Sequence, residues 1–131
     1  MNALGRFEGP AERNVFGEPL QPCSSDPLTG FYRTGYCSAG PEGQAVHLMC
    51  IAASDDFLDY SRSVGNDLTT PMPQFAFPGL VAGDRWCLVA QRWVQAHLDR
   101  KAPRLYLRAT HEAVLGLVSL DILRPYALDL N

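Results

Sequence analysis

The sequence lacks the features that would place it in several large functional classes. Among its 131 residues, 11 are Lys or Arg and 14 are Asp or Glu, so the net charge is −3 and no basic face for nucleic acid is visible. No apolar run approaches the roughly 20 residues that a membrane span needs. The stretch from Met1 to Arg13 has no apolar segment of a secretory signal. We therefore expect a cytoplasmic protein that binds neither nucleic acid nor a membrane.

The spacing of a common zinc site is also missing. Between Cys23, Cys37, Cys50 and Cys87 lie 13, 12 and 36 residues, and no pair has the short C-x₂₋₄-C spacing of a zinc knuckle. We therefore expect no metal and no cofactor. In a reducing cytoplasm the cysteines are expected to be free thiols. Two alternatives stay open, since the thiols of the turn-rich segment could converge on a metal with Cys50 or Cys87, or pair on oxidation.

What is present fits a small globular protein. Apolar residues make up 47% of the chain and charged residues 19%, which is ordinary for a folded domain. We expect a flexible N-terminal arm over 1–13 and a single globular domain over 14–131. Two stretches rich in Gly and Pro, 17–43 and 66–83, predict long loops. The aromatic side chains in these stretches predict that the loops are ordered and packed on the domain.

The remaining segments predict an α+β fold with a small sheet covered by about three to four helices. An apolar run of strand length identifies the central strand, and Ser54 and Asp84 are typical N-caps of the helices that follow them. The expected strands lie near 30–35, 46–53 and 104–109, and the expected helices near 55–64, 85–101 and 111–124. The periodicity gives no strand order.

Several motifs together resemble those of one family. They are NVFGEPLQPC, DPLTGFYRTGYC, VGNDLTTP, FPGLVAGDRWC and ATHEAVLGLVSL. In this combination the chain resembles a family of small bacterial proteins catalogued as a domain of unknown function, number 2237. The resemblance implies a stand-alone cytoplasmic domain and carries no activity. It also implies that relatives often have two further cysteines, at the places of Tyr36 and Val89 here, so a metal site that needs those thiols is not supported in this chain.

Two cysteines are the candidate catalytic residues. Cys87 is expected in the first turn of the helix that Asp84 caps, where the helix dipole and Arg85 would favour a thiolate. Cys37 lies in the turn-rich segment and has no evident packing role. The alternative for Cys87 is a buried core cysteine beside Trp86, because free cysteine is among the most buried residue types.

Four polar residues are the candidate ligand-binding residues. They are Arg33, Asp67, Arg85 and His111. All four are expected in turns or at the ends of elements, where binding sites are usually built, and an arginine can hold an anion bidentately. We expect them to line one concave surface together with the two candidate cysteines. Structural alternatives are ion pairs for the arginines, a turn for Asp67 and an exposed helix start for His111.

Two functions follow as hypotheses. The first is a binding module that recognises a small ligand or a protein partner through a polar site built by the loops. The second is a thiol-dependent enzyme or redox protein that uses Cys37 or Cys87. We favour the binding module, because the sequence assembles no complete set of catalytic residues.

Overall fold

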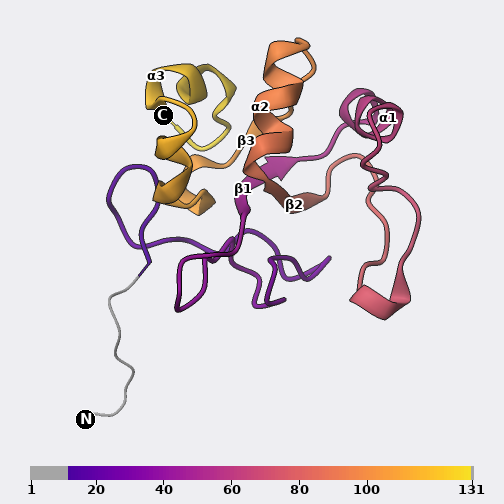
Figure 1. The fold of residues 1–131 in the computed structure, drawn as a ribbon, viewed down its shortest axis with the longest axis horizontal. Coiled ribbons are helices and arrows are strands. Elements are labelled where there is room, and N and C mark those ends of the chain that lie inside the picture. The colour runs from indigo at the N-terminus through magenta and orange to yellow at the C-terminus, as the bar shows by residue number, and fades with distance from the viewer. Residues whose placement is uncertain (1–11, 131) are drawn as a thin grey trace.

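The structure is a computed structural model that describes residues 12–130, and its centre is a three-stranded antiparallel sheet of order β2-β1-β3 (Figure 1). The strands are β1 (His47–Ala52), β2 (Arg85–Val89) and β3 (Arg104–Leu105). The central strand is the continuous apolar run of the sequence, and its four inner residues are buried. The predicted α+β fold is confirmed. The predicted flexible arm over 1–13 lies outside the described residues except for Glu12 and Arg13.

The first helix agrees closely with the prediction from the sequence. Helix α1 (Asp55–Ser63) begins after Ser54, whose hydroxyl accepts a hydrogen bond from the Phe57 N–H at 3.1 Å. Two aspartates in its first turn interact favourably with the helix dipole. Phe57 and Leu58 bury one face of the helix, so a single cap and one apolar stripe define this element.

The predicted helix over 85–101 is wrong in its first part. Residues 85–89 form β2, and helix α2 covers only Ala90–Leu98. Trp86 packs in the main core while Cys87 belongs to a separate cluster, which is the alternation of a strand. The buried residues Ala90, Trp93 and Ala96 show helical spacing only beyond that point. Cys87 therefore does not lie at a helix N-terminus.

Asp84 has a different role from the predicted one. Its carboxylate accepts a hydrogen bond from the Val81 N–H at 2.9 Å and so closes a turn before β2. The cap position of α2 is Val89, which offers no side-chain hydrogen bond. The electropositive helix end expected beside the cysteines is absent from this place in the fold.

The C-terminal part is less regular than predicted. The expected strand near 104–109 shortens to β3 followed by the 3-10 helix η2 (Leu107–Ala109). The expected helix near 111–124 divides into the 3-10 helix η3 (Glu112–Gly116) and helix α3 (Leu120–Leu123), and the 3-10 helix η4 (Arg124–Tyr126) follows. Ser119 caps α3 as its type suggests. No helix in the described part of the chain is long and apolar enough to cross a membrane.

Residues 30–35 do not form the predicted strand. Gly30, Arg33 and Gly35 have φ values of 95°, 54° and 90°, which belong to turns and not to extended backbone. The segment instead runs along the outer edge of β2, where the Thr29 hydroxyl accepts the Cys87 N–H at 2.8 Å. Figure 1 shows the irregular segment, in indigo and purple, on the side of the sheet away from α2.

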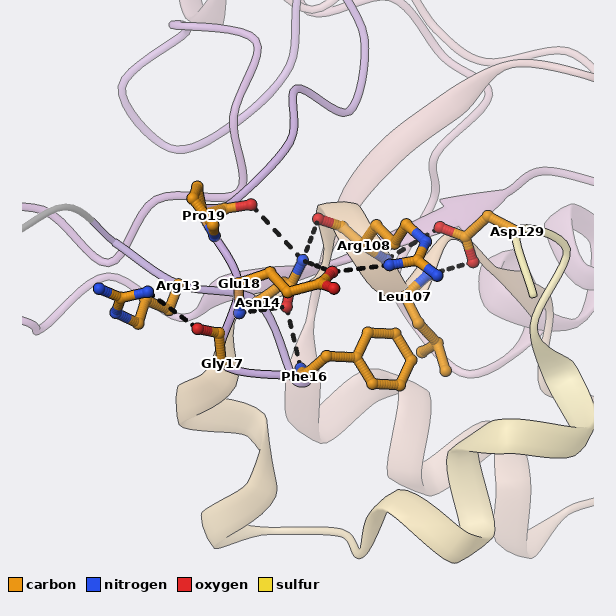
Figure 2. Close-up of polar contacts among 9 residues, drawn as sticks. All are labelled: Arg13, Asn14, Phe16, Gly17, Glu18, Pro19, Leu107, Arg108 and Asp129. Atoms are coloured by element: carbon orange, nitrogen blue, oxygen red, sulfur yellow. Dashed lines mark hydrogen bonds and ion pairs between the residues drawn. The ribbon is translucent and has the colours of Figure 1, made fainter. Parts of the chain in front are cut away.

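Asn14 fixes the start of this irregular segment (Figure 2). Its side chain is fully buried, and its Oδ1 accepts the N–H groups of Phe16 and Glu18 at 2.9 and 3.1 Å. Its Nδ2 donates to the Arg108 carbonyl oxygen at 3.1 Å. One amide therefore holds a tight turn and ties it to a residue 94 positions away. A further short 3-10 helix, η1 (Pro73–Phe75), lies in the other long loop.

Candidate functional site

All four cysteines meet on one face of the sheet. Cys50 and Cys87 are Cα partners on β1 and β2, so their side chains lie on the same face. Cys23 and Cys37 come from the irregular segment, and the pairs are Cys23–Cys50 and Cys37–Cys87. No cysteine is free. The expectation of free thiols is therefore wrong for this structure, because the fold brings together residues 27 and 50 positions apart.

The two disulfides form one compact, buried cluster. The Sγ atoms of Cys23, Cys37 and Cys87 lie within 4.8 Å of one another. None of the four side chains exceeds 3% exposure, and Tyr106 and Ala109 pack against them. Because Cys37 and Cys87 are bonded to each other and shielded from solvent, neither is a nucleophile in this state. Their catalytic role stays a prediction that requires prior reduction.

A cleft lined by several polar side chains opens directly beside this cluster. Its volume is about 580 Å³, and its wall includes Cys23 from the irregular segment and Arg85 from β2. Three hydroxyl groups and two carboxylates share the wall with them. Among the described residues the lining is Pro22, Cys23, Ser24, Ser25, Asp26, Thr34, Gly35, Gly83, Asp84 and Arg85. The sequence predicted only Arg85 among these, and the sole local signal for the others was a Cys-Ser-Ser-Asp-Pro run in a turn-rich segment.

Arg85 is held in place by an aromatic ring. Its guanidinium carbon lies 3.8 Å from the centroid of the Tyr106 ring, which also packs on the cysteine cluster. Within residues 12–130 no side chain or carbonyl accepts a hydrogen bond from this guanidinium. The stacking fixes the plane of the group and leaves its edge of N–H donors free for a ligand.

Arg33 does not join Arg85. It donates to the carbonyl oxygens of Gly30 and Phe75 at 2.6 and 2.8 Å and lies 5.1 Å over the Trp86 ring. Because Arg85 and Trp86 are neighbours on β2, the two arginines contact opposite faces of the strand. Arg33 thus connects the two long loops through carbonyl oxygens, and among the described residues it forms no ion pair with a carboxylate.

The surroundings of Arg33 include His47. Burial and the charge of Arg33 together lower the pKa of His47. The His47 Nδ1 and the Arg33 Nε are both buried and have no partner among the described residues. The His47 ring stacks on Phe31 at 5.8 Å, so this pair belongs to the packing of the first loop.

Asp67 organises its own turn. It accepts hydrogen bonds from the hydroxyls of Thr70 and Thr69 at 2.6 and 2.7 Å, and from the Thr69 N–H at 2.8 Å. These bonds, with the Thr70 hydroxyl foremost, hold the pKa of Asp67 well below its usual range. The exposed carboxylate is thus occupied by its neighbours, as the turn alternative proposed.

His111 is a buried capping residue. Its Nδ1 accepts the Ala113 N–H at 3.0 Å, so the hydrogen of the neutral ring lies on Nε2, which is 3.0 Å from the Glu12 carboxylate. The same carboxylate accepts from the Ser38 hydroxyl and the Ala39 N–H. Neither His111 nor Asp67 lines the cleft, so the structure does not place the predicted residues on one concave surface.

Comparison with known proteins gives a family and no activity. No curated protein matches the chain. Residues 13–127 match the family described as "Uncharacterized protein conserved in bacteria (DUF2237)". This match covers most of the chain and includes the cysteine cluster and the cleft. The chain therefore belongs to this family of bacterial proteins.

Proposed function

We propose that the protein is a binding module that takes a small polar ligand in the cleft beside Cys23. The observation that carries this proposal is the Arg85 guanidinium, which lines a cleft of about 580 Å³ while it stacks on Tyr106. A ligand anion would find a planar donor group that is already oriented. Little side-chain ordering would then oppose binding.

The charges of the cleft define the class of ligand. Within the part of the chain that the structure describes, Arg85 is its one cation, and Asp26 and Asp84 are its two carboxylates. One oxygen of Asp84 already accepts the Val81 N–H, but no described residue donates to the exposed Asp26 carboxylate. The Ser24 Oγ accepts the Asp26 N–H at 3.2 Å and keeps its own hydrogen to donate. A small zwitterion of the amino-acid type balances these groups, with its carboxylate on Arg85 and its ammonium group near Asp26.

The test is a titration of the full-length, oxidised protein with a panel of amino acids. Two half-ligands, acetate and methylammonium, serve as reference compounds. Amide chemical shifts are followed by NMR. We expect the largest shifts at residues 23–26 and 83–85. Arg85→Gln should weaken binding roughly 10- to 100-fold, since a hydrogen bond to a charged group contributes about 1.5–3 kcal/mol.

A matched variant controls for the loss of a positive charge. Arg100→Gln removes an exposed arginine that does not line the cleft, and it should leave binding unchanged. Shifts that map to another surface, or equal affinities of Arg85→Gln and the unmodified protein, would contradict the proposal.

A second candidate function is thiol–disulfide exchange, which one observation favours. Cys23 lines the cleft and is bonded to the buried Cys50. A thiolate arriving through the cleft would attack the Cys23 Sγ, form a mixed disulfide and release Cys50 as a thiolate. A second substrate thiol would then displace Cys23. The net reaction oxidises two substrate thiols to one disulfide and transfers two electrons and two protons to the cysteine pair.

This candidate predicts a trapped intermediate. In Cys50→Ser, the remaining Cys23 thiol should react with an aromatic disulfide reagent through the cleft, whereas the Cys37–Cys87 pair should stay intact by mass spectrometry. An unreactive Cys23 in the folded variant would argue against exchange at this site.

We also propose a cytoplasmic location, where thiol reductants would act on these disulfides.

A further inference from the structure

We propose that the four cysteines bind one zinc ion when both disulfides are reduced. Three of the Sγ atoms already lie within 4.8 Å of one another, and the fourth, that of Cys50, is bonded to Cys23. This inference does not depend on any ligand in the cleft. It assigns to the cluster a state that the spacing of the cysteines in the sequence did not indicate.

The geometry of the cluster is close to that of a closed zinc site. Four thiolates at about 2.3 Å from a tetrahedral zinc ion are separated from one another by roughly 3.8 Å. The bonded sulfurs must therefore move apart, and the unbonded sulfurs among Cys23, Cys37 and Cys87 need to approach by about 1 Å at most. The Cys50 Sγ lies outside this group of three and has farther to move. All four side chains are almost fully buried, which suits a closed site in which four thiolates, and no water molecule, bind the zinc ion. A four-coordinate structural site fits this arrangement.

Two of the four cysteine ligands lie on rigid strands, and the other two lie on a segment that can adjust. Cys50 and Cys87 are held opposite each other on paired strands. Cys23 and Cys37 lie on the irregular segment, which is braced by hydrogen bonds from the Cys23 N–H to the Gly35 carbonyl oxygen at 2.7 Å and from the Gly35 N–H to Thr29 at 3.0 Å. Two strand cysteines would fix one edge of the tetrahedron, and the loop cysteines could adjust to complete it.

Charge compensation is also at hand. Zinc with four thiolates has a net charge of −2, which is costly to bury without a counter-charge. Arg85 lies on the same face of β2 as Cys87 and stacks on Tyr106, which packs against the cluster. A guanidinium next to a metal–thiolate centre would favour the charged, metal-bound state over four neutral thiols.

The change of state is balanced with a named reductant. Two molecules of a water-soluble phosphine and two of water convert the two disulfides into four thiols and two phosphine oxides. The phosphorus atoms supply four electrons and water supplies the four protons. One Zn²⁺ then replaces the thiol protons as it binds the sulfurs. The oxidised protein has no thiolate to offer, so the expectation of no zinc stays a prediction for that state.

The experiment is an anaerobic titration of the phosphine-reduced, full-length protein with Co²⁺, followed by displacement with Zn²⁺. We expect thiolate-to-cobalt absorption and the visible bands of tetrahedral cobalt to saturate at one equivalent, and zinc to abolish them. Native mass spectrometry should show one zinc per reduced chain and none on the oxidised chain.

Variants test which atoms are ligands. Cys37→Ser and Cys50→Ser should each weaken zinc binding by more than about 100-fold, beyond the roughly 10- to 100-fold cost of losing an outer-shell partner. Ser38→Ala, next to a proposed ligand, keeps all four thiols and should bind zinc like the unmodified chain. If the reduced apo chain unfolds, one equivalent of zinc should restore its circular dichroism. Absence of stoichiometric metal, or cysteine variants that bind as well as Ser38→Ala, would overturn the proposal.

Discussion

Replacing Asn14 by alanine should be among the most destabilising single changes outside the apolar core. The side chain is fully buried and makes three hydrogen bonds of 3.1 Å or shorter, two of them to backbone N–H groups in its own turn (Figure 2). Alanine removes these bonds and leaves polar backbone groups without partners. At roughly 0.5–1.5 kcal/mol per bond, the expected loss is about 2–4 kcal/mol. The two longer contacts of Nδ2, both at 3.5 Å, add little.

The measurement is urea unfolding, supported by calorimetry. A loss of this size should lower Tm by very roughly 8–16 °C, at about 4 °C per kcal/mol for a chain of this length. Asn14→Asp keeps the acceptor but turns an oxygen toward the Arg108 carbonyl, so it should recover only part of the stability. Gln21→Ala is the matched control, because only the backbone N–H of Gln21 bonds to a described residue. A loss below about 1 kcal/mol in Asn14→Ala, or an equal loss in the control, would refute the argument.

Three further predictions concern the loops. Gly30→Ala should lower the free energy of unfolding by at least about 2 kcal/mol, because φ is 95° and the new Cβ would overlap the Tyr36 carbonyl oxygen. In urea unfolding, the control Gly17→Ala should lower it less, since φ is 77° there but the space around the new Cβ is open. Asp67→Ala should speed the exchange of the backbone amide hydrogens in the turn that Asp67 holds. In the unmodified chain, the protection of these amides should persist when the pH falls below the ordinary pKa of an aspartate, because the pKa of Asp67 is lowered. Burial would raise the pKa of Glu12, but its hydrogen bonds lower it, so its stabilising contribution is complete above its ordinary value of 4.5 and is lost as the pH falls through the lowered value. Glu12→Gln should flatten that part of the curve of unfolding free energy against pH, and an unchanged curve would contradict the assignment.

The sequence predicts the elements that local signals define. The apolar run of β1, the Ser54 cap of α1 and the Ser119 cap of α3 each depend on neighbouring residues, and each occurs close to its predicted place. Between residues 85 and 98 a strand runs directly into a helix, and its apolar residues fit a helical period by coincidence. The difference arises from pairing with β1, which is a tertiary contact that periodicity does not contain.

The site was less predictable than the fold. The sequence names Arg85 only as a candidate, and its ring partner Tyr106 lies 21 positions along the chain and carries no motif. The cysteine pairs cross between loop and sheet, so their spacing looked unlike any compact site. Polar residues in turns such as Asp67 satisfied their own backbone, and the same chemistry that suggests a ligand site also builds a turn.

The contact between Thr29 and the outer edge of β2 bears on whether separate copies of the chain associate with one another. An open strand edge invites another chain to add a strand of its own. Here a hydroxyl oxygen occupies the outward N–H of Cys87, and the Cys37–Cys87 bond clamps the covering loop to the strand that it protects. By covering the edge of β2, the loop prevents strand pairing between molecules. A chain in which this clamp is removed should self-associate as its concentration rises, even where each copy still folds.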